Sequence, residues 1–254
     1  MTKKQNALNA CFLVAIVGLS IPLVRRMTLT VRANGISTPY TVTLKLTIHD
    51  AQGKQLTPEV ITTTAVRSDG SRSITSLQSR ATGVDATRYV HMASGGLVTI
   101  GDLMKIKTSW NRPTPDITDW YRDPSRNCAV TLSGKRVRTS RLETFSGEEY
   151  LGNIRTAKIT HDSNVEWFAI QAGCAMVKAR YDFGERGINE QDFVSLTVGQ
   201  PLTNLFDING LREVGPAEFQ SLRRKVLAIP CSVECEASDQ KDNERYLSQK
   251  ALLQ

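Results

Sequence analysis

The sequence predicts a mainly β protein: a curved antiparallel sheet or incomplete β-barrel, with one or two helices near the C-terminus. The first observation is strict alternation of polar and apolar residues, clearest over residues 40–48 (YTVTLKLTI), which is typical of a strand with one buried face. The second is that such segments recur along the chain without helical patterns between them. The third is that a helical pattern becomes clear only after Gly215.

The predicted strands are short and are separated by turn signals. Asp69-Gly70 predicts a hairpin turn, because glycine accepts the positive φ that tight turns need. Residues 111–127 contain three prolines and predict a long irregular loop. The expected strands cover residues 28–32, 40–48, 60–67, 73–78, 88–92, 97–100, 104–110, 141–145, 153–161, 165–169, 174–183 and 193–198.

The helical pattern begins at Pro216, which suits the first position of a helix because that position needs no N–H donor. Phe219, Leu222 and Val226 fall on one face of the helix, and Pro230 is expected to end it. Residues 228–254 then form a polar C-terminal tail that contains a C-x3-C pair. The preceding residues 27–227 are predicted to be a single β-rich domain.

The first 26 residues indicate export. Lys3 and Lys4 precede an uncharged, mostly apolar run over residues 11–24, the pattern of a secretory signal. Arg25 and Arg26 follow directly and no clear cleavage site precedes Ala33, so an uncleaved membrane anchor is the alternative. The protein is therefore expected to be periplasmic or extracellular, or else anchored in the inner membrane through residues 11–24.

The net charge of +7 does not predict nucleic-acid binding. Four of the 32 basic residues lie in the first 26 positions, which leaves 28 basic against 25 acidic residues, a formal charge of +3. The most basic segment, residues 105–141, holds nine Lys or Arg against three Asp and also contains Trp110 and Trp120. We interpret it as a solvated, loop-rich surface, and expect no nucleic-acid partner.

Four cysteines follow the N-terminal segment, and export would favour their oxidation. Cys231 and Cys235 have a spacing that favours a local disulfide over a metal site, because no histidine lies near them in sequence. Cys128 and Cys174 are then the remaining candidate pair, which depends on the fold. No metal and no cofactor are expected.

No catalytic constellation is evident. The sequence has three histidines, and His161 is next to Asp162, but adjacent residues of a strand point to opposite faces, so we expect a turn at residues 162–164. Cys174 would need a base within hydrogen-bond reach to act as a nucleophile, and no local motif supplies one. Cys174 is therefore predicted to be a structural residue, and the chain is predicted not to be an enzyme.

Three segments resemble the periplasmic lipoprotein-carrier (outer-membrane lipoprotein sorting) superfamily. They are WFAIQAGCAMVKARYDFG, FVSLTVGQPLTNLFDI and GLREVGPAEFQSL, within about residues 140–225. The resemblance implies a strongly curved antiparallel sheet whose concave apolar face can hold acyl chains or a partner peptide, and it implies no catalytic residues. The sequence lacks the clear amphipathic helix that carriers place soon after the signal.

The sequence thus predicts a non-enzymatic exported or envelope-associated protein that binds an apolar ligand or lipoprotein in a curved sheet. Its partner would be a lipid, an acyl chain or an envelope protein. Val42, Leu44, Leu46 and Ile48, with the residues around Phe193, Ser195 and Thr197, are expected to line the sheet. The alternatives are a membrane-anchored structural or protein-interaction module of the cell envelope, and a cysteine-dependent enzyme.

Overall fold

The computed structural model describes residues 38–80, 83–111 and 144–251 of the chain. The chain divides into two compact units, Met1–Ile36 and Ser37–Gln254, and every described residue belongs to the second. The predicted strand at residues 28–32, the predicted loop at residues 111–127 and the N-terminal apolar run all lie outside the described residues, apart from Asn111.

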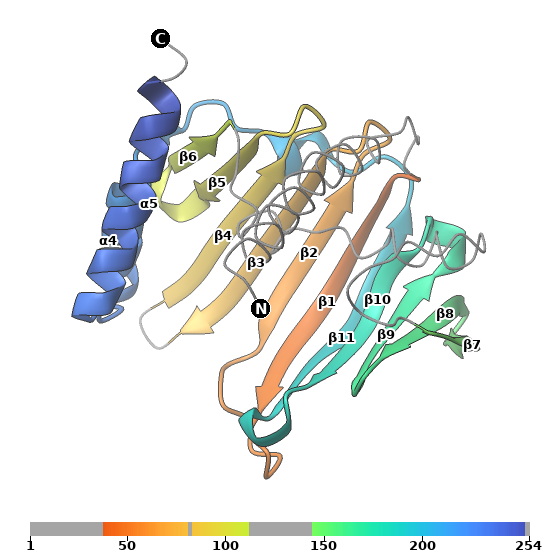
Figure 1. The fold of residues 1–254 in the computed structure, drawn as a ribbon. Coiled ribbons are helices and arrows are strands. Elements are labelled where there is room, and N and C mark those ends of the chain that lie inside the picture. The colour runs from red at the N-terminus through yellow and green to blue at the C-terminus, as the bar shows by residue number, and fades with distance from the viewer. Residues whose placement is uncertain (1–37, 81–82, 112–143, 252–254) are drawn as a thin grey trace, which may run out of the picture. The chain divides into compact units, whose positions relative to one another are not determined.

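The described residues form one open sheet of 12 strands with two α-helices near the C-terminus, which confirms the predicted fold class (Figure 1). The strands lie in the order β12-β6-β5-β4-β3-β2-β1-β11-β10-β9-β8-β7. They are β1 (Tyr40–His49), β2 (Val60–Val66), β3 (Arg72–Arg80), β4 (Gly83–His91), β5 (Leu97–Gly101), β6 (Ile106–Trp110), β7 (Thr144–Leu151), β8 (Ile154–His161), β9 (Asn164–Ala169), β10 (Ala175–Asp182), β11 (Ile188–Val198) and β12 (Arg212–Glu213).

Pairing in the sheet is antiparallel except at one edge. The short strand β12 pairs in parallel with β6, with Arg212 opposite Ile106, so the sheet is mixed and not purely antiparallel. A crossing segment, residues 199–211, makes this possible: after the interior strand β11 the chain passes through the 3-10 helix η4 (Thr203–Phe206) and reaches the β6 edge of the sheet. Antiparallel hairpins connect most other neighbours, as the turn signals predicted.

The two faces of the sheet bury different clusters. Tyr40, Val42 and Leu44 alternate along β1 and belong to a cluster that includes Val177 of β10. On the opposite face of the sheet, β2, β4 and β5 contribute a second cluster, which Phe206 of η4 covers. The crossing segment therefore closes one face of the β2–β5 region.

A bulge in β11 changes which residues of this strand are buried. Leu44 pairs with Phe193 and Thr43 pairs with Ser195, so Val194 is the extra residue. Phe193 and Leu196 consequently pack against the β1 cluster, whereas strict alternation from Phe193 would have placed Ser195 in line with it.

The helices are α4 (Pro216–Leu227) and α5 (Val233–Ala251), which lie side by side at the β6 end of the sheet (Figure 1). α4 begins at the predicted proline and ends where Ala228 takes a left-handed conformation with φ of 50°. Phe219 is buried as predicted, but Val226 is exposed and Leu227 is buried in its place. Among the described residues, no helix is long and apolar enough to cross a membrane.

Candidate functional site

A cavity of about 190 Å³ lies between one face of β4–β6 and the hairpin of α4 and α5. We call it the helix–sheet cavity. Its floor comes from the strands and its roof from the two helices. The residues that line it are Thr87, Tyr89, Thr99, Thr108, Trp110, Pro216, Phe219, Gln220, Arg223, Asp239 and Asp242.

The strand register places the floor residues on one face. Tyr89 is the partner of Thr99 across β4 and β5, and Thr99 is the partner of Thr108 across β5 and β6. Directly paired residues share a face of the sheet, so these three side chains form a row. Trp110 lies two residues after Thr108 and shares that face.

The roof residues of α4 follow helical spacing. Pro216, Phe219, Gln220 and Arg223 occupy positions i, i+3, i+4 and i+7, which places them on one side of the helix. Asp239 and Asp242 are three residues apart and therefore lie on one side of α5. Each element therefore presents a single stripe to the cavity.

An ion pair fixes α4 to the sheet beside the cavity. Arg223 donates through Nη2 to Asp85 Oδ2 at 2.5 Å and through Nε to Asp85 Oδ1 at 3.3 Å. Burial by itself lowers the pKa of Arg223, but the hydrogen bonds and the negative charge of Asp85 raise that pKa above its usual value. The guanidinium thus stays positive next to the cavity, and its bonds to Asp85 use only Nε and Nη2.

Aromatic contacts and a polar bridge attach α5 to the floor. The rings of Trp110 and Tyr246 meet edge to face with centroids 5.8 Å apart. The Tyr246 hydroxyl donates to Glu213 Oε1 at 3.2 Å, and Glu213 accepts a bond from the Ser109 amide at 2.8 Å. The polar helix α5 is therefore held on the sheet through a buried tyrosine.

The cavity combines aromatic walls with hydroxyl and charged groups. Tyr89, Trp110 and Phe219 supply apolar surface, and Thr99, Gln220 and Arg223 supply hydrogen-bonding groups. Small-molecule sites also combine aromatic side chains with polar groups that fix the ligand, and in this cavity the polar side chains are the larger share. Its volume is of the order of an engineered 150 Å³ apolar cavity that takes up benzene, so it can hold a ring or a short alkyl segment.

The structure separates the predicted cysteines. Cys231 and Cys235 lie at the start of α5 and are joined by a disulfide bond. Cys174 lies directly before β10, is buried and disulfide-bonded, and takes a left-handed conformation with φ of 66°. Cys128 lies outside the described residues, so its pairing with Cys174 stays a prediction.

The histidines do not come together. His161 ends β8, and Asp162 takes a left-handed turn conformation, so the predicted turn is present. The buried His161 has its Nε2 at 3.9 Å from Glu166 Oε2, and Glu166 Oε1 accepts a 2.7 Å bond from the Tyr181 hydroxyl. This buried carboxylate is a polar contact that the sequence prediction missed, because Glu166 lies in β9 and its two partners lie in β8 and β10.

A charged ladder crosses the strands far from the cavity. Lys158 and Lys178 lie 5.4 and 5.5 Å from the ring centroid of Trp167. Glu149 accepts bonds from Lys158 and Trp167, which lower the pKa of this carboxyl, and Lys178 lies 3.5 Å from Asp192. Because each lysine has a carboxylate partner, the ladder is a largely neutral polar surface.

Comparisons with known proteins return solved structures only. No protein-family model and no curated protein matches the chain. LprF from Mycobacterium bovis is 13% identical with a TM-score of 0.33, covering 65% of this chain and 89% of that one. A LolA superfamily protein from Nitrosomonas europaea is 8% identical with a TM-score of 0.29, covering 69% and 94%. An outer membrane lipoprotein-sorting protein domain from Vibrio parahaemolyticus is 10% identical with a TM-score of 0.29, covering 71% and 93%.

Two of these three structures thus come from the superfamily that the sequence segments resemble. TM-scores of this size describe a partial likeness of the folds and carry no functional argument.

Proposed function

We propose that the protein is a non-enzymatic, exported or envelope-associated binding protein that holds one end of an amphiphilic ligand in the helix–sheet cavity. The observation that carries the proposal is the cavity itself, where aromatic rings from the sheet and from α4 face a guanidinium and hydroxyl groups. Such a site favours a ligand with both an apolar and a hydrogen-bonding part.

The volume sets the size of the bound segment. A 150 Å³ apolar cavity accepts the six carbons of benzene, so a cavity of about 190 Å³ accommodates about six to eight carbon atoms. A whole long acyl chain does not fit. The ligand is therefore a short-chain or aromatic amphiphile, or a longer lipid of which one end enters the cavity.

The charges suggest which head group is bound. Asp239 and Asp242 are partnered by Arg224 and Arg245, at 2.5 and 3.6 Å, so they add little free negative charge. Arg223 keeps Nη1 outside its pair with Asp85 and can donate from that atom to a ligand oxygen. A carboxylate or an ester carbonyl fits this donor.

A cavity-filling substitution tests the proposal. Thr99→Phe places a ring in the middle of the floor, and phenylalanine suits a strand position, so the sheet should form. Thr197→Phe makes the same chemical change at an exposed position of β11 and serves as the matched control. We expect octanoate binding, measured by calorimetry, to weaken at least tenfold in Thr99→Phe and to stay unchanged in Thr197→Phe. Equal binding by both variants would contradict the proposed site.

Export is tested separately. N-terminal sequencing of protein purified from its own cells is expected to give a start near Ala33 if the apolar run is a cleaved signal. An intact Met1 would instead indicate the anchored form, with membrane contact through residues 11–24. Detection of the protein in the cytoplasmic fraction alone would contradict export.

A further inference from the structure

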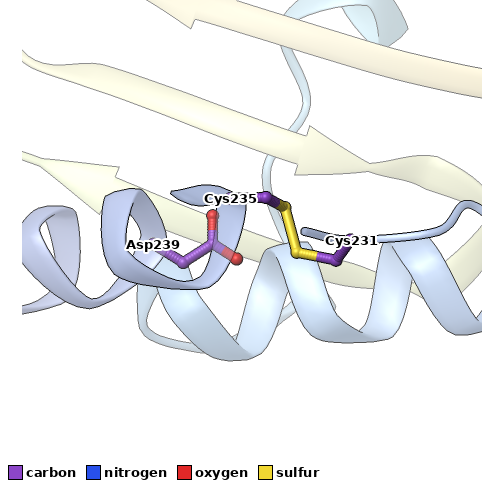
Figure 2. Close-up of side chains that lie close together, drawn as sticks. All are labelled: Cys231, Cys235 and Asp239. Atoms are coloured by element: carbon purple, nitrogen blue, oxygen red, sulfur yellow. A yellow bond between two sulfur atoms is a disulfide. The ribbon is translucent and has the colours of Figure 1, made fainter. Parts of the chain in front are cut away.

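The two cysteines at the start of α5 converge with an acidic residue. Cys235 lies in the first turn of the helix and Asp239 follows four residues later, so their side chains share one face. Cys231 approaches from the linker between the helices (Figure 2). One potential ligand atom of each residue lies within 4.8 Å of the other two.

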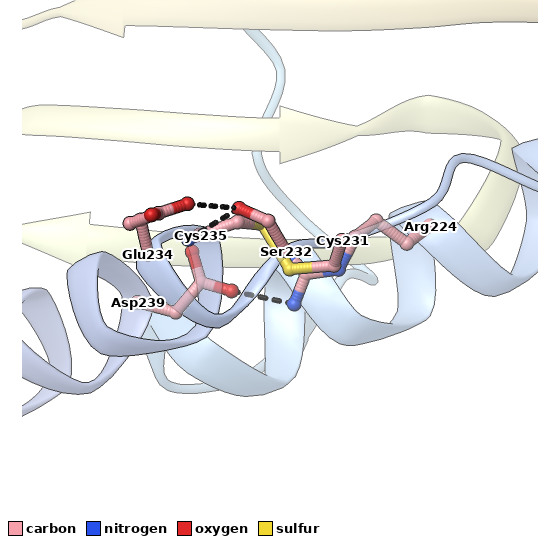
Figure 3. The surroundings of a disulfide bond; sticks show 6 residues. All are labelled: Arg224, Cys231, Ser232, Glu234, Cys235 and Asp239. Carbon is pink, nitrogen blue, oxygen red and sulfur yellow. Dashed lines mark hydrogen bonds and ion pairs between the residues drawn. A yellow bond between two sulfur atoms is a disulfide. The ribbon is translucent and has the colours of Figure 1, made fainter.

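Neighbouring side chains hold this cluster in place. Ser232 caps the helix, since its Oγ accepts a 3.3 Å bond from the Cys235 amide. Arg224 of α4 donates to Asp239 Oδ2 at 2.5 Å, as Figure 3 shows. It also donates to Cys235 Sγ at 3.3 Å. A guanidinium at this distance stabilises a thiolate on Cys235.

We propose that Cys231, Cys235 and Asp239 form a redox-gated site for a thiophilic divalent cation such as Zn²⁺. The site is closed while the disulfide exists, because neither sulfur then carries the charge and lone pairs of a thiolate. It opens when the disulfide is reduced. Asp239 also lines the helix–sheet cavity, but the inference does not depend on a ligand binding in that cavity.

The redox step requires a dithiol reductant. One thiolate of the reductant attacks the sulfur of Cys231 and releases Cys235 as the thiolate, which the Arg224 guanidinium stabilises. The second thiol of the reductant then displaces Cys231 and forms the reductant's own disulfide. Two electrons and one proton pass to the protein, the proton going to Cys231, and binding of the cation releases that proton.

The geometry and charge of the reduced cluster suit Zn²⁺. Zinc binds sulfur at about 2.3 Å and carboxylate oxygen at about 2.0–2.2 Å, so its ligand atoms lie about 3.6–3.8 Å apart in a tetrahedral site. Reduction frees the two sulfur atoms to separate to this distance, and a carboxylate oxygen of Asp239 lies within 4.8 Å of both sulfur atoms. Two thiolates and one carboxylate carry −3, so the cation together with Arg224 makes the cluster neutral.

Cobalt binding tests the site, since Co²⁺ bound by thiolates gives a charge-transfer absorption band. The full chain is reduced with a phosphine, freed of it without air, and titrated with Co²⁺, followed by displacement with Zn²⁺. We expect one bound cation in the reduced protein and none in the oxidised protein. Cys231→Ser and Cys235→Ser should each weaken Co²⁺ binding at least tenfold.

Asp239→Asn isolates the carboxylate ligand without touching a cysteine. It should weaken Co²⁺ binding at least tenfold, whereas Glu236→Gln removes an exposed carboxylate from the same helical turn and should leave it unchanged. Circular dichroism verifies that each variant keeps its helices. The proposal is overturned if the reduced protein gives no band, if the cysteine variants bind as well as the native chain, or if Asp239→Asn and Glu236→Gln behave alike.

Discussion

Arg88 of β4 is predicted to be the most important polar contact between the sheet and the crossing segment. Its side chain is only 9% exposed and forms a two-point pair with Asp102, at 3.1 Å through Nε and 2.7 Å through Nη2. Its Nη1 also donates to the carbonyl oxygens of Asn204, Leu205 and Asp207 at 3.2, 3.1 and 2.8 Å. One guanidinium therefore serves four acceptor groups.

Arg88→Met removes this cation and keeps much of the side-chain volume. Breaking a buried ion pair by removing one partner costs about 3–5 kcal/mol. The lower end applies, because Asp102 is 38% exposed and the Leu205 carbonyl keeps a 2.6 Å bond from Ser73 Oγ. We expect the free energy of unfolding, measured by urea denaturation, to fall by about 3 kcal/mol.

The matched control is Arg155→Met. Arg155 makes the same two-point pair with Glu148, at 2.6 and 2.8 Å, but on an exposed surface of β7 and β8. Exposed pairs contribute little because water solvates both partners well. A loss below about 1 kcal/mol in Arg88→Met, or equal losses in the two variants, would refute the reasoning that burial gives Arg88 its importance.

Two further predictions concern backbone shape and pH. A Cβ at Gly187, where φ is +98°, would overlap the His49 carbonyl oxygen, whereas a Cβ at Gly184, where φ is +64°, meets nothing within 4 Å. Gly187→Ala should therefore lower the free energy of unfolding by about 3 kcal/mol or more and Gly184→Ala by about 1 kcal/mol, and similar losses would contradict the overlap with His49 as the cause. Burial, and then the charge of Arg72, lower the pKa of His91 below 6.5. The unfolded chain then binds more protons than the folded chain, so the contribution of His91 to the free energy of unfolding is complete above pH 6.5 and declines as the pH falls toward the lowered pKa. Arg72→Gln should make this decline shallower when the free energy of unfolding is measured by urea denaturation at successive pH values. An unchanged or steeper decline would count against the assignment to His91 and Arg72.

Much of the sheet could be predicted from alternation alone. β1 shows an uninterrupted polar–apolar pattern, and its predicted range of residues 40–48 differs from the structure by one residue. The pattern predicts that β11 begins at Phe193, but it begins at Ile188, because residues 189–192 are polar and obtain their strand structure from pairing with β1 and β10. The bulge at Val194 is set by that pairing as well, so periodicity could not predict it.

The candidate sites were harder to predict, because they depend on contacts distant in sequence. Tyr89 and Arg223 line the same cavity although 134 positions separate them. The sequence pattern of α4 identifies Phe219 as a buried residue of the helix. It does not identify the polar residues Gln220 and Arg223, because polar residues are equally common on the exposed side of a helix. Asp239 is one of several acidic residues in a polar helix, so its place beside Cys231 and Cys235 becomes evident only in the structure.

The length dependence of ligand binding tests the central claim most directly. Calorimetric titration of the native protein with straight-chain carboxylates from butanoate to hexadecanoate measures how much alkyl chain the cavity buries. Each buried methylene contributes about 0.8 kcal/mol, or about a fourfold gain in affinity. We predict this gain in affinity up to about eight carbons and a plateau for longer chains, because the cavity volume of about 190 Å³ limits how much alkyl chain is buried. No binding at any length, or an affinity that keeps rising to hexadecanoate, would contradict it.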